Sequence, residues 1–86
     1  MNAALTKAER KAAIIKNMQQ LTAKLPTDLA AWPAQKAQDF NFYTRAFSTY
    51  ARPKGSFKQL LACVARIADF YGVSMVRIDP CHGEAA

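Results

Sequence analysis

The 86-residue chain is long enough for one small domain, residues 1–86, and too short for a substrate cleft between two lobes. With 51% hydrophobic and 21% charged residues, its composition is that of a folded domain and excludes a disordered segment. The net charge of +6 favours nucleic acid or an acidic protein surface as a partner. Because we find no long apolar run and no signal-peptide core, we expect a cytoplasmic protein with no membrane partner.

The first predicted helix spans residues 6–25. Thr6 and Glu9 have the spacing of a capping box, which places the helix start, and Pro26 ends the helix. Apolar residues recur along one face, at Ile14, Met18, Leu21 and Leu25. Residues 1–13 are basic and offer only alanine and leucine for burial, so we expect them to project as a basic N-terminal arm.

A second helix is predicted over residues 33–51, after a short helical turn that ends at Trp32. It concentrates aromatic side chains, at Phe40, Phe42, Tyr43, Phe47 and Tyr50. Four of these share one face, which indicates core packing, whereas Phe42 points elsewhere. Trp32 and Phe42 lie off the main apolar stripe, so core packing and contact with a protein partner both stay open for them.

The third helix, predicted over residues 56–71, has the clearest pattern in the chain. Pro53 and Gly55 interrupt the chain before it, and Ser56 can cap its start. One face is apolar, with Phe57, Leu60, Leu61, Val64, Ala68 and Tyr71. Gly72 fits the left-handed position just after the last turn.

Residues 64–83 contain a small residue, a glycine and an apolar residue in close succession, at Ala68, Gly72 and Val73. Further apolar residues lie at Ile67, Tyr71 and Ile78. In this spacing the segment resembles part of the helix-turn-helix family of DNA-binding motifs. The resemblance implies a second helix that reads base edges in the major groove of DNA.

The positions that would face the groove depart from the family pattern, since they hold Ser74, Met75, Val76, Asp79 and Pro80. Only Ser74 can read a base, and Pro80 would interrupt the second helix. Two other conformations therefore stay open for residues 73–78. One is an extended strand that docks on a partner or pairs with a second copy in a homodimer. The other is an irregular segment packed over the core.

Together these elements predict an all-α fold, a small three- to four-helix bundle with a short irregular or extended C-terminal segment over residues 72–86. We expect no enzyme, because the acidic residues are scattered and His82 is the only histidine. Cys63, Cys81 and His82 lack the paired spacing of zinc ligands, so we expect neither a metal nor a cofactor.

Two functions of different classes follow from these features. The first is a basic accessory protein that binds nucleic acid through phosphate contacts. Its candidate contacts are Lys7, Arg10, Lys11, Arg52, Lys54, Lys58, Ser74 and Arg77. In this hypothesis Phe42, Tyr43 or Tyr50 could also stack on unpaired bases. The second function is an adaptor or inhibitor, such as a phage- or plasmid-type modulator, that docks on a larger protein. Its candidate contacts are Trp32, Phe42, Val73, Met75 and Val76.

Overall fold

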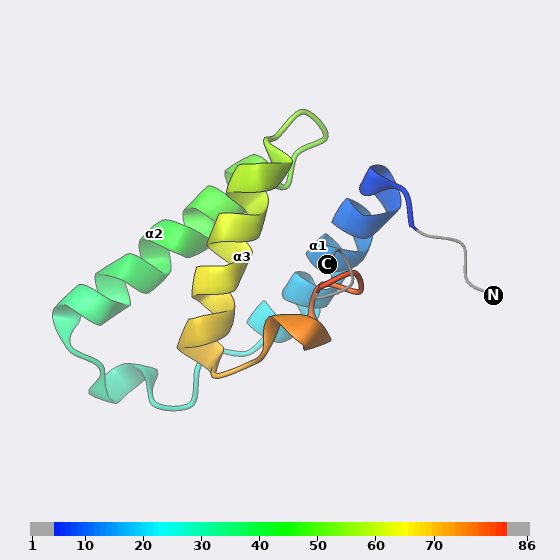
Figure 1. Cartoon of the computed structure of the whole chain (residues 1–86). Helices are drawn as coiled ribbons and strands as arrows, with labels where there is room; N and C mark the ends of the chain where they lie inside the picture. The colour runs from blue at the N-terminus through cyan, green and yellow to red at the C-terminus, as the bar shows by residue number, and fades with distance from the viewer. Residues whose placement is uncertain (1–4, 83–86) are drawn as a thin grey trace.

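The computed structural model describes residues 5–82 and is all-α, as predicted (Figure 1). Its three α-helices are α1 (Lys7–Thr22), α2 (Ala34–Tyr50) and α3 (Phe57–Tyr71). Two short 3-10 turns, η1 (Leu29–Ala31) and η2 (Met75–Arg77), precede α2 and follow α3. Helices α1 and α3 run in the same direction, and α2 runs antiparallel to both (Figure 1). No strand occurs between residues 5 and 82.

Local sequence signals set the helix starts. The Thr6 hydroxyl accepts a hydrogen bond from the Glu9 N–H at 3.1 Å, and the Glu9 carboxylate accepts one from the Thr6 N–H at 2.9 Å. This confirms the capping box, which satisfies two N–H groups that the first turn leaves without partners. At the start of α3, the Ser56 hydroxyl alone forms the cap by accepting from the Gln59 N–H at 3.3 Å.

Gly72 ends α3 in the left-handed conformation, with φ of 69°. Its N–H donates to the carbonyl of Asp69, and the next N–H, that of Val73, donates to Ala68. These bonds use carbonyls that the last turn of a helix leaves free. The prediction for Gly72 is therefore confirmed.

Helix α1 ends four residues before Pro26, earlier than the sequence pattern indicated. Its last residue is Thr22, whose hydroxyl donates to the Met18 carbonyl. Leu25 precedes a proline, which disfavours helical dihedral angles, and its side chain is 69% exposed. The prediction that Leu25 belongs to the buried face of this helix was therefore wrong.

The core lies between α1 and α3 and is closed by the C-terminal segment. Its fully buried members are Ile14, Met18, Leu60, Val64, Ile67, Ala68 and Ile78. Each large apolar side chain buried in this way contributes about 1.5–3 kcal/mol to folding. Aromatic residues of α2, among them Phe47 and Tyr50, also pack against this cluster.

A second cluster, of aromatic rings, joins the start of α2 to the end of α3. The centre of the Phe40 ring lies 5.7 Å from the centre of the Trp32 ring and 5.5 Å from that of the Phe70 ring, and both pairs meet edge to face. Such pairs stabilise a fold beyond the area that they bury. The indole N–H of Trp32 is buried and has no hydrogen-bond partner within residues 5–82. The indole of Trp32 is therefore held by contacts of its ring and not by a hydrogen bond.

The C-terminal segment is irregular and packs over the core. Between Gly72 and residue 82 the one helical element is the 3-10 turn η2, so the second helix that the helix-turn-helix resemblance implies is absent from the described residues. The extended conformation was also wrong, because three N–H groups in this segment, those of Arg77, Ile78 and Asp79, donate to carbonyls within it. Ile78 is buried, and its carbonyl accepts from the Asn17 amide at 2.8 Å. The segment is thereby fixed against α1.

Candidate nucleic-acid interface

Two of the predicted phosphate contacts from the start of α1 meet the start of α3 at Phe57. The Lys7 ammonium lies 5.6 Å from the centre of the Phe57 ring, and the Arg10 guanidinium lies 5.2 Å from it. Cations are attracted to the face of an aromatic ring at these distances. Phe57, whose partly buried ring also packs against the core, therefore fixes the position of both cations.

A third contact ties α1 to the loop that joins α2 and α3. The Lys11 ammonium donates to the carbonyl of Arg52 at 2.6 Å and to that of Gly55 at 3.2 Å. Arg52 and Lys54 lie in this loop, and Lys58 lies in the first turn of α3 next to Phe57; all three are exposed. Cations that are more than forty residues apart in sequence thus come together at one end of the molecule.

We call this region the basic end, and define it as Lys7, Lys11, Arg52, Lys54 and Lys58. Glu9 is also exposed on the first turn of α1, where its carboxylate is engaged in the capping box. Five like charges gathered beside one carboxylate repel one another and oppose folding. Such a cluster favours an anionic ligand that would relieve the repulsion.

The expectation of a projecting arm over residues 1–13 does not fit these contacts. Lys7 and Arg10 lie against Phe57, and Lys11 binds the loop, so this part of the segment is packed against the fold. Residues 1–4 lie outside the described residues. The sequence indicated a projecting segment because the apolar partner of these cations, Phe57, comes from a distant helix.

Arg10 is a predicted phosphate contact whose charge is already paired. Its Nε and Nη2 atoms donate to the two carboxylate oxygens of Asp79 at 2.9 and 2.5 Å. Asp79 is 2% exposed, and its Oδ1 atom also accepts from the N–H of Cys81. The hydrogen bonds from Arg10 lower the pKa of Asp79, although burial acts in the opposite direction. Arg10 therefore holds the C-terminal segment and is not part of the basic end.

The two remaining predicted nucleic-acid contacts lie elsewhere. The Ser74 hydroxyl accepts from the N–H of Val76 at 3.3 Å and so caps η2. Arg77 is exposed and lines a hollow of about 310 Å³ that Asn17 and Gln20 of α1 also line. Neither residue joins the basic end, so these two predictions have no support in the geometry.

The predicted protein-docking residues separate into packed and exposed ones. Trp32 is partly buried between Phe40 and Phe70, with the Lys36 ammonium 4.2 Å from the centre of its ring. Val73 and Met75 pack against the core. Phe42 and Val76 are exposed, at 64% and 65%.

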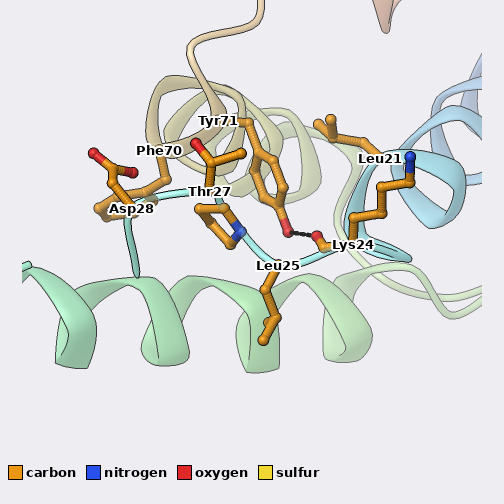
Figure 2. A pocket seen from close by; sticks show the side chains of 8 residues that line it. Leu21, Lys24, Leu25, Thr27, Asp28, Phe70 and Tyr71 are labelled. Carbon is orange, nitrogen blue, oxygen red and sulfur yellow. Dashed lines mark hydrogen bonds between the residues drawn. The ribbon is translucent and has the colours of Figure 1, made fainter. Parts of the chain in front are cut away.

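A cavity of about 230 Å³ lies at the opposite end of the molecule from the α2–α3 loop, and Figure 2 shows its lining side chains. It is lined by Leu21, Lys24, Leu25, Pro26, Thr27, Asp28, Phe70 and Tyr71. The Tyr71 hydroxyl donates to the Lys24 carbonyl at 2.6 Å, and burial raises the pKa of this phenol. Asp28 and Lys24 lie on opposite sides of the Tyr71 ring (Figure 2). The lining contains one carboxylate, that of Asp28.

The cysteines occupy different environments. Cys63 is buried in α3, where desolvation raises the pKa of its thiol, and Cys81 lies in the turn that follows Asp79. Within residues 5–82, no group of three histidine, cysteine, aspartate or glutamate side chains could hold a metal ion. In the same part of the chain, no helix has both the length and the apolar character needed to cross a membrane.

Sequence reasoning missed two residues that shape this region, Phe57 as the platform for Lys7 and Asp79 as the partner of Arg10. Phe57 follows the pattern of a core residue, and Asp79 lies 69 residues from Arg10, so no local pattern connects either to its partner. Comparisons with known proteins give no further guidance. The chain matches no protein-family model, no curated protein and no solved structure.

Proposed function

We propose that this protein is a small three-helix bundle that binds nucleic acid without enzymatic activity, mainly through phosphate contacts at its basic end. The observation that supports the proposal is the meeting of two distant basic segments. The Lys11 ammonium binds the carbonyls of Arg52 and Gly55, and Lys7 lies against Phe57. A dense group of cations on one surface is the electrostatic pattern typical of nucleic-acid-binding proteins.

The balance of forces at the basic end supports the same proposal. Lys11 is anchored by two carbonyls that do not neutralise its charge. Arg52, Lys54 and Lys58 are exposed and reach solvent from a loop and an adjoining helix turn. Phosphate contacts at such a surface would release counterions, which makes binding weaken steeply as the salt concentration rises.

The first prediction concerns charge reversal at the basic end. Lys54→Glu combined with Lys58→Glu should weaken binding to a labelled oligonucleotide by at least about tenfold at about 50 mM salt. It should also reduce the slope of log affinity against log salt concentration by about 2, because two phosphate contacts are lost. Fluorescence anisotropy at about 50 and 200 mM salt measures both quantities.

The matched control reverses the same number of charges at the opposite end, through Lys24→Glu combined with Lys36→Glu. Lys24 follows α1, and Lys36 lies in the first turn of α2. This variant has the same net charge and should keep most of the affinity. Equal losses in both variants would show that net charge alone drives binding, and unchanged affinity in the Lys54 and Lys58 variant would contradict the proposal.

The second candidate function is protein docking, and the exposure of Val76 at 65% is the observation in its favour. Val76 lies in η2, on a segment fixed by Ile78 and Asp79. A protein partner that uses this surface should be lost in Val76→Glu, while nucleic-acid affinity should stay unchanged. Trp32, Val73 and Met75 contribute less to this candidate because they are packed.

A further inference from the structure

Phe42 is an exposed aromatic ring that the core leaves unused. The inward aromatic residues of α2 share one helix face, which packs toward α3. Because an α-helix turns by about 100° per residue, Phe42 lies about 120° around the helix axis from the centre of that face. Its side chain is 64% exposed. An aromatic ring held in water on a rigid helix is available to a ligand.

Most side chains around Phe42 are polar. Phe42 lines an open hollow of about 420 Å³ whose other lining residues are Gln38, Asn41, Arg45, Ala46 and Thr49. Amide side chains both donate and accept hydrogen bonds, as the edges of nucleobases do. A hot spot for a protein partner is instead a well-packed pocket that excludes water. The hollow therefore fits a flat polar ligand better than a protein side chain.

Two arginines give this surface a positive charge. Arg45 lines the hollow itself, and the Arg66 guanidinium lies 5.2 Å from the centre of the Tyr43 ring. The Tyr43 ring in turn lies 5.1 Å from that of Phe42, edge to face. The carboxylate one turn away, Asp39, accepts a hydrogen bond from Gln35. Charge complementarity at Phe42 thus favours an anionic ligand.

The side of α2 that bears the hollow leads toward the basic end. Phe42, Arg45 and Thr49 lie at helical spacing along one side of α2, and Arg52 follows just beyond the end of the helix. Arg52 lies ten positions after Phe42, which corresponds to about 15 Å at the rise of a helix. Single strands commonly occupy roughly four or more nucleotides on a small binding domain, so one strand can reach from the basic end to Phe42.

We propose that Phe42 stacks on an unpaired base, with Arg45 on the adjacent phosphate, so that the protein binds single-stranded nucleic acid in preference to duplex. This inference rests on the proposed function and names its ligand class. In a duplex the bases already stack on one another and present no free face to Phe42. Duplex binding then depends on the basic end alone.

The test compares Phe42→Ala with Leu25→Ala, which removes another exposed apolar side chain at the opposite end of the fold. Anisotropy titrations use a labelled oligothymidine and a duplex of equal length at about 50 mM salt. Phe42→Ala should weaken single-strand binding roughly five- to hundredfold and leave duplex binding unchanged. Leu25→Ala should change neither affinity.

A spectroscopic variant gives an independent result. Oligothymidine, but not duplex, should quench the fluorescence of the indole introduced by Phe42→Trp. The emission of the partly buried Trp32 should stay constant in both titrations. Unaltered single-strand affinity in Phe42→Ala, or equal losses for both ligands, would overturn this inference and leave the proposed function standing. If the wild-type protein binds neither ligand, the proposed function itself fails.

Discussion

Asp79 shows how one side chain can hold the end of this chain in place. Its carboxylate is almost fully buried and receives two hydrogen bonds from Arg10 and one from the N–H of Cys81. A buried charge is costly unless it is paired and hydrogen-bonded, and here every contact satisfies the carboxylate. Because Arg10 lies in α1 and Asp79 follows η2, the pair joins the two ends of the described chain.

The second prediction follows from this pair. Asp79→Asn should lower the free energy of unfolding by about 2 kcal/mol near neutral pH, the usual contribution of hydrogen bonds to a charged group. Urea denaturation followed by circular dichroism measures the change. The control is Asp69→Asn, at an exposed position on α3, which should stay within about 0.5 kcal/mol of the wild type. A similar loss in both variants would contradict the role assigned to the pair.

The third prediction gives the sign of the pH dependence. Arg10 lowers the pKa of Asp79 in the folded state below its ordinary value of 3.8. The stability that this carboxylate contributes is therefore fully present above the unfolded pKa and is lost as pH falls through the folded one. Between about pH 5 and pH 2, the wild type should lose more stability than Asp79→Asn. Parallel curves of the free energy of unfolding against pH for the two proteins would show that the Arg10–Asp79 pair does not cause this loss of stability.

At the scale of elements, the α2–α3 loop is shaped by a close approach at Gly55. A Cβ atom at this position would overlap the Tyr50 carbonyl oxygen and lie 2.7 Å from the carbonyl carbon. The Gly55 carbonyl also accepts from Lys11. Gly72 is different, because its φ of 69° favours glycine while nothing lies within 4 Å of an added Cβ. One glycine is required for space and the other for backbone conformation.

The fourth prediction compares these two glycines. Gly72→Ala should cost about 1 kcal/mol of stability, since only the left-handed conformation opposes it. Gly55→Ala should cost about 2 kcal/mol or more, because the loop must move away from Tyr50. Denaturant titration of both variants tests the order. A smaller cost at Gly55 than at Gly72 would mean that the loop can shift freely.

At the scale of the whole molecule, the distribution of charge opposes the compactness of the fold. The net charge is +6, and Lys7, Lys11 and the three exposed cations of the α2–α3 region lie together. Repulsion among exposed charges is screened as ionic strength rises. Stability should therefore depend on salt even without any ligand.

The fifth prediction uses this dependence. Raising sodium chloride from about 10 to about 200 mM should raise the Tm by roughly 2–4 °C, which corresponds to about 0.5 kcal/mol for a domain of this size. The increase in Tm should be smaller in the variant that carries Lys54→Glu and Lys58→Glu. In this variant the two glutamates attract the remaining cations of the basic end, so there is less repulsion for salt to screen. Differential scanning calorimetry measures both. A Tm that falls with salt would show that attractive pairs dominate the surface.

The sequence by itself determined the three helices, because the signals that define them act within a few residues. The Thr6–Glu9 capping box, the Ser56 cap and the Gly72 terminus all depend on backbone groups within one turn. Helical periodicity also separated the exposed Phe42 from the inward aromatic residues of α2. These features needed no knowledge of distant contacts.

Only the tertiary structure decided which side chains meet. The Lys11 ammonium reaches carbonyls 41 and 44 residues away, and Arg10 finds Asp79 across 69 residues. No local pattern encodes such pairs, because they depend on the direction in which each helix leaves its loop. Long-range packing also bound the C-terminal segment to α1 through Ile78. The basic end exists because folding places α1 beside the α2–α3 loop, where Phe57 and two backbone carbonyls can hold its cations.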